Sequence, residues 1–193
     1  MLRAPDIEEG AEIDGGDYAE LAEEASIDGV TLKNLDLSEV KLGPVTFTDV
    51  AMRNVDLSNA SLQRVVARRV EIRGSRAVGV RLSLELATDL SIMDSKLDYA
   101  NLHLEKVKGV AVFESCSFRE ATIAGDLSNT VFLDCDFTGT EFRARSASKC
   151  DLRTSRLTGA RGLLSLRGAK ITMEQAVTIS AMIAAEAGLV VAG

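Results

Sequence analysis

The sequence predicts an all-β solenoid with a square cross-section, followed by a short C-terminal α-helix. Two observations predict the solenoid: large apolar residues recur at every fifth position, and a smaller residue precedes each of them by two. A helix-capping sequence near the end of the chain predicts the helix. Aromatic residues make up only 4% of the chain, so aliphatic side chains in regular packing must fill the core.

The five-residue period is the strongest feature of the sequence. At a composition that is 46% hydrophobic, chance produces an unbroken apolar run of this length in only about two of a million trials. The run consists of Ile27, Leu32, Leu37, Leu42, Phe47, Met52, Leu57, Leu62, Ala67, Ile72, Ala77, Leu82, Ala87, Ile92, Leu97, Leu102 and Val107. It resumes one residue later at Phe113 and returns to the first phase at Leu127.

A period of five fits neither a helix, which repeats every 3.6 residues, nor a flat strand, which repeats every two. It suits a chain that bends after every five residues and closes a square turn with four bends. Stacked at the β-sheet spacing of about 4.8 Å, the central positions form a rod roughly 32 Å long. Each turn then contacts only its neighbours, and its inward side chains form continuous columns.

Two irregularities predict local departures from this coil. The phase slip between Val107 and Phe113 predicts one extra residue bulging out near 108–112. Glu85 and Glu105 fall on small inward positions one turn apart, where unpaired carboxylates are costly. We expect a bulge or loop to turn them outward, with Arg145 two turns later in the same column; the alternative is a recognition site on a deformed face.

Segments such as Leu35-Asp36-Leu37 and Cys135-Asp136-Phe137 resemble the A(D/N)LXX signature of pentapeptide-repeat proteins. The resemblance covers about residues 25–160 and implies a right-handed quadrilateral β-helix, which we assign to residues 25–171. Residues 1–24 precede it as an acidic cap or arm. This region is the source of the acidity, because residues 1–28 hold ten acidic side chains against Arg3 alone. A short helix over 17–24, with Asp17 as its N-cap, is expected there.

Residues 172–193 are assigned to a C-terminal helix and tail that dimerise. Thr172 and Gln175 form a capping box, and the helix is expected over 173–187 with Gly188 just beyond its end. Its apolar residues spread too widely for one covered face, which predicts a two-fold contact; the alternative is a cap folded onto the chain's own last turn. The predicted interface is Met173, Val177, Ile179, Met182, Ile183 and Leu189.

The C-terminal sequence, with its Gln-Ala-Val helix and Ala-Gly-Leu turn, resembles the mycobacterial branch of the family associated with fluoroquinolone resistance. The resemblance implies a dimer joined at its C-terminal ends that inhibits DNA gyrase by imitating duplex DNA. The acidic N-terminal segment has no counterpart in that branch. An interaction scaffold with an unrelated protein partner is the alternative.

Assigning successive repeats to four faces tests the implied mimicry. The face centred on Leu37, here called the anionic face, carries six acidic and four basic outward residues. Its predicted partner-binding residues are Asp36, Glu39, Asp56, Asp98, Glu120 and Asp136. A structural role for the aspartates is the alternative, since Asp is usual at this repeat position. The face centred on Leu42, here called the basic face, has no interleaved aromatics, so nucleic-acid binding is not expected. Its charged residues are Lys41, Arg64, Arg81, Arg143 and Arg145 against Glu141.

The sequence offers no catalytic constellation, so no enzyme activity and no small-molecule substrate are expected. His103 is the single histidine, and the spacing of Cys116, Cys135 and Cys150 fits neither zinc nor a disulfide framework; buried reduced thiols are expected. No cofactor or metal is expected. The absence of an apolar span or signal-like start favours a cytoplasmic protein without membrane contact.

Overall fold

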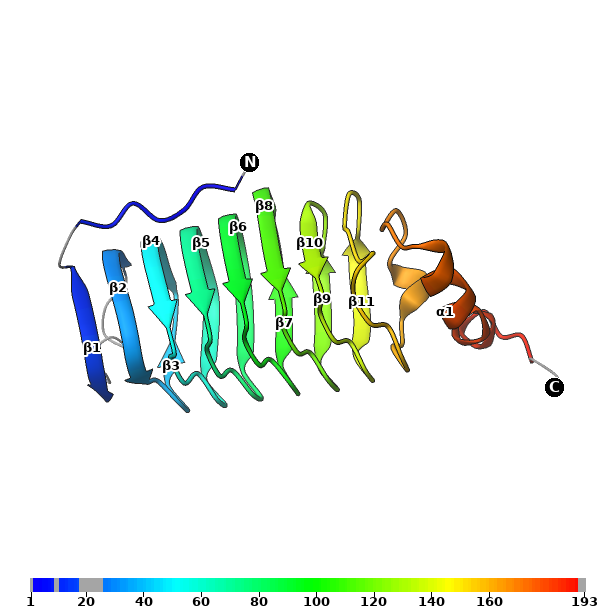
Figure 1. The fold of residues 1–193 in the computed structure, drawn as a ribbon, viewed down its shortest axis with the longest axis horizontal. Coiled ribbons are helices and arrows are strands. Elements are labelled where there is room, and N and C mark those ends of the chain that lie inside the picture. Colours follow the sequence, from blue (N-terminus) through cyan, green and yellow to red (C-terminus); the bar gives the residue numbers. More distant parts are fainter. Residues whose placement is uncertain (1, 9–10, 18–25, 191–193) are drawn as a thin grey trace.

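The computed structural model describes residues 2–8, 11–17 and 26–190. These residues form a single parallel coil that extends into a rod, with a helix at its C-terminal end (Figure 1). The strands are β1 (Glu12–Asp17), β2 (Ser26–Asp36), β3 (Lys41–Leu42), β4 (Val45–Arg53), β5 (Ser61–Arg73), β6 (Arg81–Met93), β7 (Asn101–Leu104), β8 (Val107–Glu114), β9 (Thr122–Asp126), β10 (Thr130–Leu133) and β11 (Glu141–Ser146). A 3-10 helix, Leu163–Ser165, and α1 (Met173–Glu186) follow.

Strand pairing shows the twenty-residue turn directly. Leu32 pairs with Met52, Met52 with Ile72, and Ile72 with Ile92, all in parallel. Every twentieth residue therefore returns to the same face after four bends of five residues each, as the period predicts. The expected fold class, an all-β solenoid with a short C-terminal helix, is confirmed.

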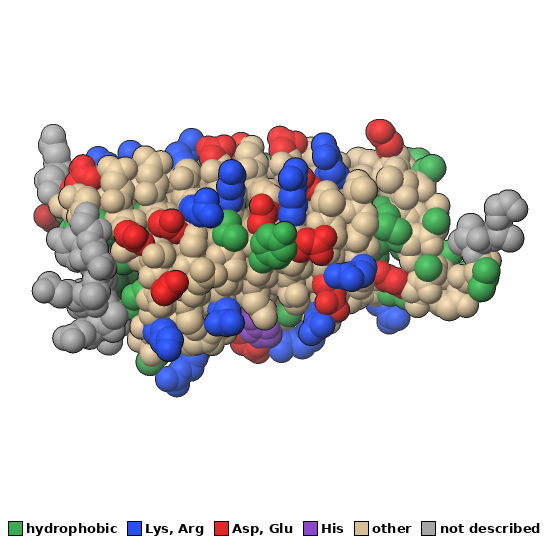
Figure 2. All heavy atoms as spheres, turned by 90° about the horizontal axis from the view of Figure 1, so that it is seen from below, with side chains coloured by type: hydrophobic (Ala, Val, Ile, Leu, Met, Phe, Trp, Pro, Cys, Tyr) green, Lys and Arg blue, Asp and Glu red, His purple; other side chains and the backbone are tan. Residues whose placement is uncertain are grey.

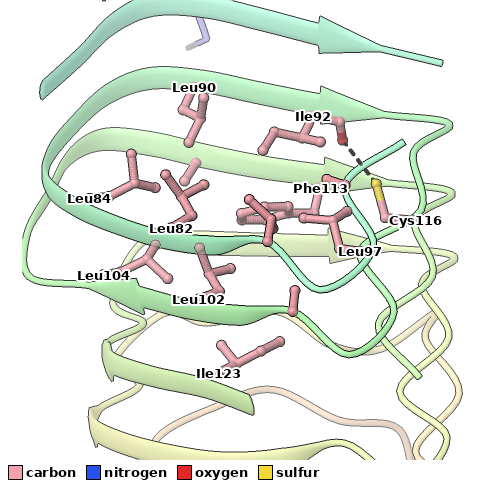
Figure 3. Packing of buried hydrophobic residues seen from close by; sticks show 14 of the residues in the cluster. Leu82, Leu84, Leu90, Ile92, Leu97, Leu102, Leu104, Phe113, Cys116 and Ile123 are labelled. Carbon is pink, nitrogen blue, oxygen red and sulfur yellow. Dashed lines mark hydrogen bonds between the residues drawn. The ribbon is translucent and has the colours of Figure 1, made fainter. Parts of the chain in front are cut away.

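The core consists of the predicted columns of inward side chains. Leu37, Leu57 and Leu97 are 3%, 5% and 2% exposed, and the backbone residues beside them form one ladder of bridges. Figure 3 shows leucine and isoleucine side chains of successive turns converging inside the tube. Toward the C-terminus the columns change to phenylalanine, and rings one turn apart stack with centroids 5.0 Å apart in the Phe113–Phe132 pair.

Both predicted irregularities are present. At the slip, Thr88 pairs with Lys108 but Leu90 pairs with Ala111, so one extra residue bulges out at Gly109–Val110. At the other, Leu84 takes the place opposite Val65 and is buried, which turns Glu85 outward into solvent. Leu104 does the same one turn later, so Glu105 is exposed as well. The preferred interpretation, a bulge that exposes both carboxylates, is confirmed.

The two ends of the coil are built differently. At the N-terminal end β1 adds a parallel strand beside β2, while residues 2–8 run back along the outside of the rod (Figure 1). The predicted helix over 17–24 falls on residues 18–24, which lie outside the described residues, and Asp17 ends β1. Among the described residues, no helix is both long and apolar enough to cross a membrane.

Helix α1 closes the C-terminal end through the predicted capping box. The Gln175 backbone N–H donates to the Thr172 hydroxyl at 3.1 Å, and the Thr172 N–H donates to the Gln175 side chain at 2.8 Å. Gln175 also donates to the carbonyls of Leu152 and Ser155, which fixes the helix to the last turn. At the other end of the helix, the Glu186 carboxylate accepts hydrogen bonds from the backbone of the 3-10 helix.

Candidate protein-binding faces

The anionic face is the first candidate surface. Parallel backbone bridges connect one outward position per turn along it, in the order Asp36, Asp56, Arg76, Lys96, Ser117, Asp136 and Arg156. The structure therefore places Asp36, Asp56 and Asp136 in one column, as the face assignment predicts. The column is not uniformly acidic, because two basic residues and a serine separate Asp56 from Asp136.

The aspartates of this column also hold the turns together. The Asp36 and Asp56 carboxylates accept hydrogen bonds from the backbone N–H groups of Ser38 and Ser58, at 2.9 and 2.8 Å. The Ser38 hydrogen bonds lower the pKa of Asp36 below its usual value. The sequence carried a signal for this role, because an aspartate followed two residues later by serine is a typical turn pattern.

Asp136 and Asp98 are more strongly engaged. Burial works against the charged form of Asp136, but hydrogen bonds from Thr138 and Arg119 outweigh it and lower the pKa. The Arg119 Nε lies 2.8 Å from the Asp136 carboxylate. Asp98 accepts hydrogen bonds from the Ser117 hydroxyl and the Arg119 backbone. Glu39 and Glu120 lie exposed at the adjacent corner, both in the left-handed backbone region.

The second candidate surface, the basic face, is partly neutralised within the chain. Arg143 pairs with Glu141, and the Arg145 guanidinium lies 3.2 Å from the Glu105 carboxylate. The Arg145 hydrogen bond, with a smaller contribution from His103, lowers the pKa of Glu105. The expected partnership of Arg145 with the outward carboxylates thus holds for Glu105. Figure 2 shows acidic and basic side chains interspersed along the rod in the view from below.

The C-terminal helix divides its apolar residues between the core and solvent. Ile179 is 3% exposed and packs on the chain's own last turn, and Met182 and Ile183 are half-buried against the core. Met173, Val177 and Leu189 are 81%, 69% and 64% exposed. The inner side of the helix therefore caps the coil. Ile179 is buried there and is not available to a partner. Met173 and Val177 on its outer side, with Leu189 just beyond its C-terminal end, form an exposed apolar row.

The three cysteines are free and buried, as expected. Cys116 and Cys135 occupy one column, and their thiols donate to backbone carbonyls inside the tube, as for Cys116 and Ile92 (Figure 3). The neighbouring Cys116 thiol and burial raise the pKa of Cys135, and burial raises that of Cys150 to about 12. The Cys135 and Cys150 thiols therefore remain protonated and unreactive. Within the described part of the chain, no cluster of His, Cys, Asp and Glu could hold a metal ion.

Comparisons with known proteins give only distant structural matches. No family model and no curated protein matches this sequence. Among solved structures, a trypsin-treated variant of QnrB1, a plasmid-mediated fluoroquinolone resistance protein, is 20% identical over 94% of this chain and 99% of that chain, with a TM-score of 0.40. Full-length QnrB1 is 13% identical over 89% and 96%, also with a TM-score of 0.40.

HetL, a pentapeptide-repeat protein involved in heterocyst differentiation regulation in the cyanobacterium Nostoc, is 20% identical over 83% of this chain and 86% of that chain, with a TM-score of 0.28. The square parallel coil of this structure, which carries the five-residue repeat, is the fold that the pentapeptide-repeat resemblance implies.

Proposed function

We propose that this chain, which has the pentapeptide-repeat fold, is a non-enzymatic dimeric rod that binds a type II topoisomerase, DNA gyrase. It would modulate the activity of that enzyme or its sensitivity to poisons such as fluoroquinolones. The observation that carries the proposal is the C-terminal end, whose sequence resembles the mycobacterial fluoroquinolone-resistance branch. The exposed apolar row of α1 and the tail beyond it supports a two-fold contact at this end, because such surface is seldom left in water.

The anionic face is the surface we assign to the topoisomerase. Asp36 and Asp56 are one turn apart, about 4.8 Å, whereas duplex DNA carries a charge about every 1.7 Å of its axis. The column is therefore a sparse imitation of phosphates. Arg76 and Lys96 confine the acidic character to two stretches, one near Asp36 and the other from Asp98 to Asp136.

A supercoiling assay with purified gyrase tests the proposal. We expect micromolar protein to inhibit supercoiling, or to reduce quinolone-stabilised cleavage. A variant with Asp36, Asp56, Asp98 and Asp136 changed to Asn should lose the effect, because Asn can still accept the turn hydrogen bonds but carries no charge. The matched control changes Lys41, Arg64 and Arg81 of the basic face to Gln and should retain it. No effect of the wild-type protein on either reaction would remove this function.

The dimer is tested separately by its mass in solution. Val177→Asp places a charge on the exposed row without touching the packed side of α1. We expect a dimer for wild type and a monomer of unchanged melting temperature for the variant, by sedimentation equilibrium. A wild-type monomer at tens of micromolar would contradict the two-fold contact.

A protein-binding scaffold with an unrelated partner is the second candidate. The specific observation in its favour is that acidic and basic residues share the anionic face, since mixed charges suit a complementary protein surface better than one that binds DNA. If gyrase is unaffected, the same two charge variants become the probes for that partner.

A further inference from the structure

The N-terminal segment, residues 2–8, lies in extended form across the outer surface of β2, β4, β5 and β6. Figure 1 shows it running back along the rod from β1 toward the level of β6. The strands below it run across its direction, so the segment passes from one turn of the coil to the next along its length. Leu2, Pro5 and Ile7 are half-buried, whereas Arg3, Ala4, Asp6 and Glu8 are exposed.

Burial beneath the segment is visible in the strand residues. Ala51 points outward between the inward residues Val50 and Met52, yet it is only 4% exposed. It lines a shallow groove with Thr31 and Glu71, its neighbours one turn away on either side, and Pro5 and Ile7 form part of the same groove. A segment of this chain therefore covers an outward-facing row.

Two buried carboxylates anchor the segment. Asp49 and Asp89 occupy the corner beside this face and are 7% and 4% exposed. The Asp49 carboxylate accepts hydrogen bonds from Arg69 and, at 2.8 Å, from the backbone N–H of Asp6. The Asp89 carboxylate lies 3.1 Å from Nε of Arg3, whose own side chain is 68% exposed. A buried carboxylate requires a cation or hydrogen-bond donors, and at Asp89 the segment supplies the cation.

The spacing of the anchors matches the geometry of the coil. Arg3 and Asp6 are three residues apart, which is about 10 Å in an extended chain. Asp49 and Asp89 are two turns apart, which is about 9.6 Å at the spacing of β-strands. An extended peptide on this surface therefore places every third residue beside the same position of every second turn of the coil.

The surface extends beyond the segment. The outward row that contains Thr31, Ala51 and Glu71 continues through Ser91 to Val112 and Val131, which are half-buried on β8 and β10. We propose that this row is a docking track for an extended peptide with a basic side chain that binds Asp89, and that residues 2–8 occupy it as a displaceable strap. A partner protein's extended segment takes the track by replacing Arg3 at Asp89.

Peptide binding in trans tests the proposal. The probe is a fluorescent peptide of residues 2–8, and its binding to a chain lacking residues 2–8 is measured by fluorescence polarisation. We expect the truncated chain to bind it at least tenfold more tightly than the full chain, in which the strap competes at high effective concentration. Asp89→Asn in the truncated chain, or alanine in place of arginine in the peptide, should abolish binding.

A second measurement uses the full-length chain, so the proposal stays testable if truncation prevents folding. Ala51→Cys places a thiol beneath the strap, and the native thiols are buried. We expect Arg3→Ala to accelerate alkylation of this thiol at least tenfold and to leave a Val112→Cys control unchanged. Failure of a folded truncated chain to bind the peptide at 1 mM, or an unchanged Ala51→Cys rate with Arg3→Ala, would overturn the proposal.

Discussion

The packing of the tube is uneven, and Ala77→Val tests how well it is understood. An apolar cavity of about 40 Å³ lies in the middle turns, and Ala67 and Ala77 are among its lining residues. Ala77 occupies the column in which Leu57 and Leu97 lie one turn to either side. Valine adds two methyl-sized groups, each worth about 0.8 kcal/mol when buried, which gives about 1.6 kcal/mol of added stability.

The assay is urea and thermal unfolding followed by circular dichroism. For a chain of this size, that gain corresponds to roughly 3–6 °C in melting temperature. The matched control is Ala87→Val. Ala87 is fully buried at an equivalent position but does not line the cavity, so overpacking should cost about 1–3 kcal/mol. Loss of stability in Ala77→Val, or an equal gain in Ala87→Val, would refute the reasoning.

Three further predictions concern the core, the corners and the response to acid. Phe132→Ala removes a ring that stacks on Phe113 and packs edge-on against Phe137, and it should cost about 3–5 kcal/mol in the free energy of unfolding, measured with urea. Gly125→Ala should lower the melting temperature or prevent folding, because its Cβ would lie 2.1 Å from the Leu104 carbonyl oxygen. The Arg69 hydrogen bond lowers the pKa of Asp49 from 3.8, so its stabilisation is complete above that pH and lost as the pH falls through the lowered value. Asp49→Asn should flatten the decrease in melting temperature below pH 4, and an unchanged acid response would contradict this assignment.

The sequence predicted the coil because its information is periodic. Each large apolar residue is repeated by its neighbours twenty positions away, so the fold class, the inward columns and the phase slip before Phe113 follow from counting. The outward turn of Glu85 also followed, since an unpaired carboxylate inside an apolar tube is too costly. The sequence did not predict that Leu84 takes the inward position of Glu85, because the shift of one residue is visible only in the strand pairing.

The surfaces were harder to predict because their contacts are not periodic. Arg3 and Asp89 are 86 residues apart, and nothing in the five-residue pattern indicates that they meet. The aspartates of the anionic face were predicted as binding residues, yet the turns already use their oxygens. Their charges remain available to a partner, but the turns already use part of their hydrogen-bonding capacity.

The extra residue at Gly109–Val110 has a consequence for how this coil tolerates insertions. From Ile92 to Phe113 the chain takes 21 residues to complete a lap, and from Phe113 to Phe132 it takes 19. The surplus is thus cancelled within the next lap, and the bridges that follow, Val131–Asp151 and Asp136–Arg156, are again twenty residues apart. Corners can vary in length only if a nearby corner compensates, so natural or engineered insertions should survive here as matched gain-and-loss pairs.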